Sequence, residues 1–110
     1  MKEANVVEAI RKAIVKAYPW AWVLKTHGGP YQVPGIPDLL VVVDGLMFGF
    51  EVKHQRPGES AQHARGRATT QQLRHIALLR AAGATAAVVL GRARARRSRP
   101  AAGASPRSRT

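Results

Sequence analysis

The sequence predicts a single α/β domain whose mixed sheet of about four strands is flanked by helices. Two segments, residues 3–18 and 70–82, carry apolar residues at the spacing of a helix. Three apolar segments between them, and a fourth after the second, are typical of strands. The predicted order is therefore helix, three strands, helix, strand. A length of 110 residues suits one domain with a modest core.

The first predicted helix, residues 3–18, is amphipathic and ends at Pro19. Glu3 lies at the edge of its apolar stripe, within about 20° of Ile10 when each residue turns ~100°. Glu8 projects away from that stripe. An acid in the first turn also complements the helix dipole, so Glu3 has a purely structural interpretation as well.

The three consecutive strands follow the first helix. The first is predicted at residues 21–26, and a loop rich in Gly and Pro comes after it. The other two, 38–43 and 46–53, flank Asp44-Gly45, and Asp-Gly is the strongest short-range signal for a two-residue hairpin turn. Residues 38–43 are apolar on both faces, which predicts an interior strand covered on both sides.

The remaining segments close the predicted domain. Residues 54–68 are polar and contain Gly, so we expect a mobile loop. The second helix, 70–82, is expected to end with Gly83 as its C-cap. Residues 84–90 are the last predicted strand.

The end of the chain differs in composition from the rest. Residues 92–110 hold seven Arg and no acid, and their Ala, Ser and Pro cannot build a core. We assign 1–91 to the folded domain and 92–110 to a basic, disordered tail. Electrostatic contact with a nucleic-acid backbone and a solvated extension without a specific role explain this tail equally well.

The charge balance favours a polyanionic partner. The chain has 18 Lys and Arg against six acids, a formal net charge of +12, and both tail and domain are basic. The lack of cysteine excludes a disulfide scaffold and thiolate zinc sites, and it fits a reducing cytoplasm. No apolar run approaches the ~20 residues of a membrane span, so we expect no membrane partner.

The predicted hairpin brings three ionisable side chains onto one face. With the turn at Asp44-Gly45, counting back along both strands places Asp38 opposite Glu51, with Cβ atoms roughly 5 Å apart. Two such carboxylates repel each other unless a cation lies between them, and Mg²⁺ prefers carboxylate oxygens. Lys53 emerges on the same face. The structural alternatives are an Asp at a strand edge, a Glu in a salt bridge and a Lys that neutralises both acids.

This pattern resembles the PD-(D/E)XK nuclease superfamily and, more closely, its VRR-NUC branch, the virus-type replication and repair nucleases. The resemblance covers roughly residues 3–90. It is carried by Gly35-Ile36-Pro37-Asp38, by Glu51-Val52-Lys53, and by Thr69-x-x-Gln72 followed by Ile76, Leu79 and Gly83. The resemblance implies a restriction-endonuclease-like core of the order αβββαβ.

The resemblance also implies Mg²⁺- or Mn²⁺-dependent hydrolysis of DNA. The metal ligands it implies are the two hairpin carboxylates, a main-chain carbonyl and a glutamate of the first helix, namely Asp38, Glu51, Val52 and Glu3. Glu3 matches the family pattern better than Glu8, although either acid could join the site. Lys53 would deprotonate the attacking water or stabilise charge on the phosphate, and both roles are open.

Gln72 has two interpretations. Thr69-x-x-Gln72 is a capping box, in which Gln reaches back to the N-cap and needs no function. The resemblance instead places a functional Gln here, close to the metal or a bound phosphate. Gln72 also lies on the helix stripe that faces the predicted sheet, so both interpretations stand.

Several further residues are expected to contact nucleic acid. They are His27, Tyr31, Arg56, Arg65, Arg67 and Thr69. A solvated loop explains the three arginines equally well, and polar surface explains His27. The resemblance implies a homodimeric, structure-specific endonuclease for branched DNA of the Holliday-junction type. Its setting would be replication, recombination or repair in the cytoplasm of a bacterial or phage-infected cell. The alternatives are a catalytically inactive, basic nucleic-acid-binding protein and a small ribosome- or capsid-associated protein, which explains the tail but not the hairpin.

Overall fold

The computed structural model describes residues 3–26 and 33–92 of the chain. Its elements in chain order are α1 (Glu3–Ala17), β1 (Trp22–Lys25), β2 (Leu39–Val43), β3 (Leu46–Gln55), α2 (Ala61–Arg65), α3 (Thr70–Ala81) and β4 (Thr85–Arg92). The predicted α/β class with a mixed four-stranded sheet is confirmed. One short helix, α2, is added to the predicted order.

The strands lie in the order β1-β2-β3-β4. The first three form an antiparallel meander, and β4 pairs parallel to β3 after the crossover through α2 and α3. Val43 lies opposite Leu46, so the predicted two-residue turn is present. Asp44 and Gly45 have φ values of 52° and 79°. Two positive values are what a type I′ hairpin turn requires, and Asp-Gly tolerates them.

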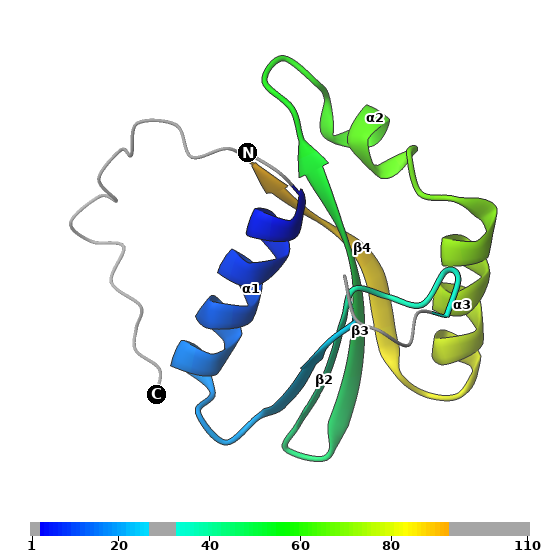
Figure 1. Cartoon of the computed structure of the whole chain (residues 1–110). Coiled ribbons are helices and arrows are strands. Elements are labelled where there is room, and N and C mark those ends of the chain that lie inside the picture. Colours follow the sequence, from blue (N-terminus) through cyan, green and yellow to red (C-terminus); the bar gives the residue numbers. More distant parts are fainter. Residues whose placement is uncertain (1–2, 27–32, 93–110) are drawn as a thin grey trace, which may run out of the picture.

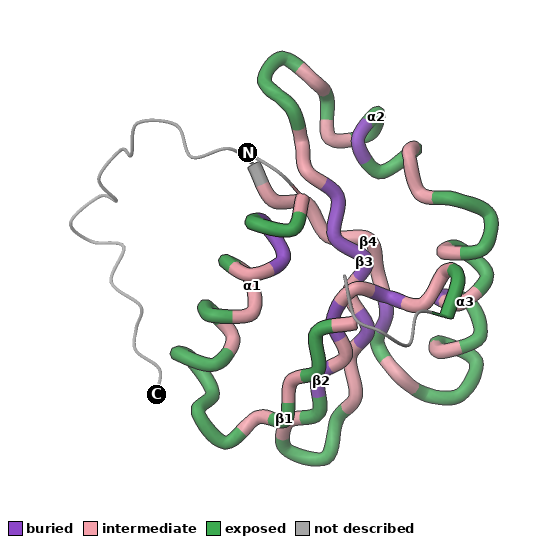
Figure 2. Tube along the Cα trace, viewed as in Figure 1, coloured by how far each residue is buried: buried purple, intermediate pink, exposed green. Residues whose placement is uncertain are grey.

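Helices cover both faces of the sheet (Figure 1). On one face, α1 packs Val6 and Val7 against Leu39 and Val52 to form the core. Figure 2 shows the buried residues gathered where α1 meets the central strands. On the other face α3 lies close to β3, because a Cβ on Gly49 would come within 2.9 Å of a Leu79 methyl group. The sheet is thus a layer between two helical layers.

The α3 face of the sheet is covered only in part, contrary to the prediction for residues 38–43. Leu39 and Val41 are buried on the α1 side, but Val42 is 38% exposed on the other. Its neighbours on β1, Trp22 and Leu24, are also exposed. The reason is geometric: α3 packs on β3 and β4, and a helix about 10 Å wide spans about two strands spaced ~4.8 Å apart.

The prediction of a loop over all of residues 54–68 is wrong. Strand β3 continues to Gln55, and α2 follows after a short turn. Ser60 is the N-cap of α2, with its hydroxyl accepting a hydrogen bond from His63 N, and Ala64 is buried. A five-residue helix is too short to show a hydrophobic period, so only the Ser N-cap signalled it.

The ends of the last elements agree with the prediction to within a few residues. Helix α3 ends at Ala81 with Ala82 as its C-cap, one residue before the predicted Gly83, which follows with a φ of 102° that favours glycine. Strand β4 runs to Arg92, which pairs with Gln55, so the folded domain extends one residue into the predicted tail. Residues 93–110 lie outside the described residues. Within the described ranges, no helix is both long and apolar enough to traverse a bilayer.

Candidate active site

Asp38 and Glu51 lie together where β2 begins. Leu39 pairs with Phe50, and continuing this register by one residue places Asp38 level with Glu51, as the hairpin count predicts. Asp38 Oδ2 accepts a 2.8 Å hydrogen bond from the backbone N–H of Val52. The charge of Asp38 also acts on the Glu51 carboxylate. The hairpin therefore brings the two acids into one site.

The Glu51 side chain is almost completely buried, since the residue is 2% exposed. Its Oε2 accepts a 2.9 Å hydrogen bond from Gln72 Nε2 and lies 3.7 Å from Lys53 Nζ. Its Oε1 is buried without a hydrogen-bond partner. Burial, followed by the charge of Asp38, raises the pKa of Glu51 from 4.5 to about 8, although Lys53 opposes the shift.

Strand β3 extends beyond the point where β2 begins, so its last residues have no β2 residue beside them. Charged side chains bind the backbone groups of β3 there instead. Val52 N–H donates to Asp38, and His54 N–H donates to Glu3 Oε2 at 2.7 Å. The His54 carbonyl accepts from Arg67 Nη2. Because the N–H and C=O of one strand residue point the same way, the Val52 carbonyl also points toward Asp38. That this carbonyl is a metal ligand stays a prediction.

Helix α1 brings Glu3, rather than Glu8, to this region. Glu3 bonds to the backbone of His54 and contributes to the raised pKa of Glu51. Glu8 instead forms salt bridges with Arg11 at 2.6 Å and Lys25 at 3.4 Å. The sequence predicted that Glu8 projects away from the apolar stripe, and its side chain does so to pair with Arg11 and Lys25. That Glu3 is a metal ligand stays a prediction.

Gln72 completes the predicted capping box and also contacts Glu51, while its functional role stays a prediction. Its Oε1 accepts from Thr69 N–H at 2.8 Å, and Thr69 Oγ1 accepts from Gln72 N–H, so the capping box is complete. Its Nε2 is left to donate to Glu51 Oε2. An amide suits this place, since one end accepts and the other donates. The cap therefore directs the donor at the buried acid.

The residues predicted to contact nucleic acid do not form one group. Arg56 and Arg65 are exposed. Arg67 is bound to Glu59 and His54, and Thr69 caps α3. His27 and Tyr31 lie outside the described residues. That any of these residues contacts nucleic acid stays a prediction.

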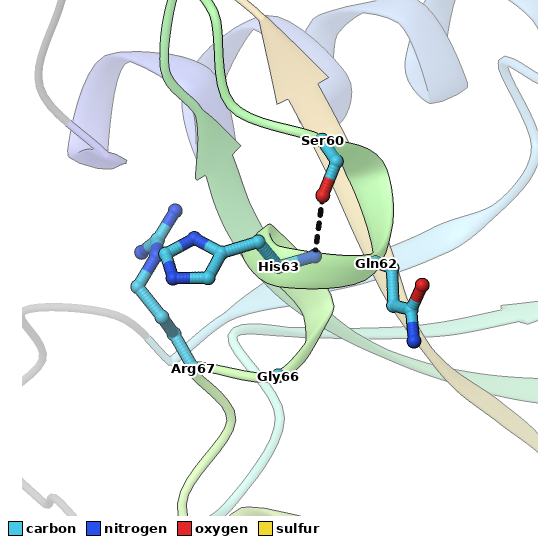
Figure 3. A pocket seen from close by; sticks show the side chains of 5 residues that line it. All are labelled: Ser60, Gln62, His63, Gly66 and Arg67. Atoms are coloured by element: carbon cyan, nitrogen blue, oxygen red, sulfur yellow. Dashed lines mark hydrogen bonds between the residues drawn. The ribbon is translucent and has the colours of Figure 1, made fainter.

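A separate pocket of about 400 Å³ lies beside α2. Its lining residues are Ser60, Gln62, His63, Gly66 and Arg67 (Figure 3). The His63 ring and the Arg67 guanidinium lie next to each other there, and both contact Glu59. Glu59 is not among the site residues predicted from the sequence. The sequence could have indicated it, because Glu59 is the only acid in the basic segment 54–68.

The donors at the hairpin suit a hard divalent cation. Two carboxylates and a carbonyl offer oxygen ligands, and the buried Glu51 Oε1 has no hydrogen-bond partner. Within residues 3–26 and 33–92, however, no three His, Cys, Asp or Glu side chains are grouped to hold a metal by themselves. A cation here would need the Val52 carbonyl and water as further ligands, as Mg²⁺ commonly does.

Comparisons of the chain with family models, with curated proteins and with solved structures found no match. The function is therefore inferred from the residues of the site and from their geometry.

Proposed function

We propose that the protein is a Mg²⁺- or Mn²⁺-dependent deoxyribonuclease of the VRR-NUC type, which hydrolyses phosphodiester bonds. The observation that carries the proposal is Glu51, an almost fully buried carboxylate placed beside Asp38 with one oxygen unpaired. Burial and the charge of Asp38 oppose ionisation of this carboxyl, although Lys53 Nζ lies 3.7 Å from it. Carboxyls whose pKa is shifted in this way are common at functional sites.

Each residue of the site has a defined part in this proposal. Asp38, Glu51 and the Val52 carbonyl would hold the cation, which supplies charge for the phosphate and lowers the pKa of a bound water. Gln72 keeps the Glu51 carboxylate oriented through its 2.9 Å hydrogen bond. Lys53 accepts the proton of the attacking water or donates to a phosphate oxygen. Water forms the new P–O bond as the bond to the leaving oxygen breaks.

The proposal also names a substrate and a cellular setting. The net charge of +12 favours binding to a phosphate backbone. A small domain contacts little DNA by itself, and a two-fold homodimer would match the symmetry of a four-way junction. We therefore propose branched DNA as the preferred substrate and the cytoplasm of a bacterial or phage-infected cell as the location. Replication, recombination or repair would be the setting.

A cleavage screen tests the proposed reaction. Linear, nicked, flapped and four-way DNA of one sequence are incubated with Mg²⁺, Mn²⁺ or EDTA. We expect cleavage that EDTA abolishes, and a loss of at least about 100-fold in Asp38→Asn and in Glu51→Gln, because each removes a charged metal ligand. Glu8→Gln is the control and should cleave normally. Cleavage that persists in EDTA or in both site variants would overturn the assignment.

The same screen distinguishes the alternative, a basic nucleic-acid-binding protein without activity. The net charge of +12 favours this alternative as well. It predicts binding to every DNA form and no cleavage with either cation. In a nuclease, by contrast, the wild type cleaves DNA with the cation, while both site variants lose cleavage and still bind DNA.

A further inference from the structure

The connection between β3 and α2 is built around Glu59. Its side chain is only 7% exposed and accepts hydrogen bonds on both oxygens. Oε1 accepts from Arg56 N–H and Arg67 Nη2, and Oε2 accepts from Arg67 Nε and contacts His63 Nδ1 at 2.6 Å. These partners, Arg67 foremost, lower the pKa of Glu59 to about 2. Glu59 is therefore charged at any working pH.

Arg67 connects Glu59 to the strand that carries the candidate active site. Its Nη2 donates to the carbonyl of His54 as well as to Glu59. The N–H of the same His54 is held by Glu3 from α1. His54 directly follows Lys53, at a part of β3 that has no β2 residue beside it. Two charged side chains from different elements thus hold the strand end next to the lysine.

We propose that Glu59, acting through Arg67, is a positioning residue that fixes the end of β3 and so places Lys53 and the Val52 carbonyl. This inference rests on the proposed nuclease function. This end of β3 pairs with β4 on one side but has no strand neighbour on its β2 side, and backbone groups on such an open edge exchange readily with water. A catalytic group displaced by about 1 Å loses on the order of 100-fold in rate. The Glu59–Arg67 pair opposes that displacement.

The chain contains a matched control pair. Arg11 also binds Glu8 with two nitrogens, and Glu8 likewise has a pKa lowered to about 2. This pair is more exposed, at 34% and 32% of the side-chain area, and it connects α1 to Lys25 of β1 rather than to β3. It thus has the chemistry of the Glu59–Arg67 pair without the contact to the strand that carries Lys53.

The first test is kinetic. Glu59→Gln and Arg67→Lys are compared with Glu8→Gln and Arg11→Lys, using Mn²⁺ and the best substrate of the screen. We expect kcat to fall about tenfold or more in the first two variants while KM stays within about twofold, since a positioning loss acts on the chemical step. The control variants should keep kcat within about twofold. An equal change in both pairs would overturn the proposal.

The second test needs no cleavage. Hydrogen exchange at the amides of residues 52–55 is measured in the same variants without metal. We expect exchange at least about tenfold faster in Glu59→Gln and Arg67→Lys, and unchanged exchange in the control pair. Unchanged exchange in all variants would overturn the positioning role even if kcat falls. A wild type that does not cleave DNA would refute the nuclease, while exchange would still show whether Glu59 fixes the strand.

Arg67→Lys also covers a failure of Glu59→Gln to fold. Lysine keeps the charge and can still pair with Glu59, but it lacks the planar fork that joins both Glu59 oxygens and the His54 carbonyl. A folded Arg67→Lys with wild-type kcat and wild-type exchange would contradict the proposal.

Discussion

At the residue scale, ionisation of Glu51 opposes folding. Its pKa is about 8 in the folded protein and near 4.5 when unfolded, because burial and Asp38 disfavour the charge. The folded state therefore holds this proton more tightly. The contribution of Glu51 to stability is full below pH 4.5 and is lost as pH rises through 8. Glu8 and Glu59, with pKa values of about 2, affect stability only at lower pH.

We predict that the metal-free protein loses stability between about pH 5 and pH 8 and that Glu51→Gln loses much less. The glutamine keeps the shape but has no proton to lose. Urea unfolding in EDTA at several pH values measures this, with Glu8→Gln as the control that should follow the wild type. Parallel curves for wild type and Glu51→Gln would show that Glu51 is not the group responsible.

Lys53 allows a second prediction at this scale. Lys53→Ala should reduce cleavage strongly, and Lys53→Arg should restore little of it if Lys53 accepts a proton. Arginine keeps the positive charge but does not act readily as a base. Single-turnover rates at saturating Mn²⁺ compare the three proteins. Full activity with arginine at this position would leave only the electrostatic role.

At the scale of elements, the start of α3 couples a helix cap to the site. Thr69→Ala and Gln72→Ala should each destabilise the protein by about 1 kcal/mol, since each breaks the capping box. Only Gln72→Ala also removes the donor to Glu51. We predict that kcat falls in Gln72→Ala and stays near the wild-type value in Thr69→Ala.

Denaturant titration and initial rates of the two variants check this prediction together. An equal loss of rate in both would mean that the cap, rather than the contact with Glu51, is what the site requires. An unchanged rate in both would leave Gln72 a purely structural residue.

At the scale of the whole molecule, we predict that the basic end of the chain can be removed without loss of the fold. Because Arg92 pairs with Gln55, the truncation that respects the fold ends after Arg92. We predict that residues 1–92 unfold cooperatively and bind DNA more weakly, with less dependence on salt. The deleted residues carry six Arg. For each phosphate contact that the truncated protein loses, the slope of log affinity against log salt concentration becomes about one unit less steep.

Titration of one oligonucleotide at several salt concentrations measures both slopes. A full-length chain with those six arginines changed to glutamine is the control, because it keeps the length and removes only the charge. Equal slopes for all three proteins would show that the tail does not bind DNA. Loss of cooperative unfolding in the truncated form would place part of the fold beyond Arg92.

Features that depend on neighbouring residues could be predicted from the sequence. Asp44-Gly45 set the hairpin turn, and the two-residue period of the strands then placed Asp38 level with Glu51. The capping-box pattern of Thr69 and Gln72 predicted the start of α3. These predictions succeeded because turns, caps and register follow local backbone preferences.

The meeting of distant segments became visible only in the folded chain. The bond between Glu3 and His54 joins residues 51 positions apart, and Arg67 reaches His54 across 13. Glu51 has an unpaired oxygen because packed elements bury it. Trp22 is exposed because α3 does not extend over β1. Such facts follow from packing, which brings together groups whose spacing in the chain carries no signal of their proximity.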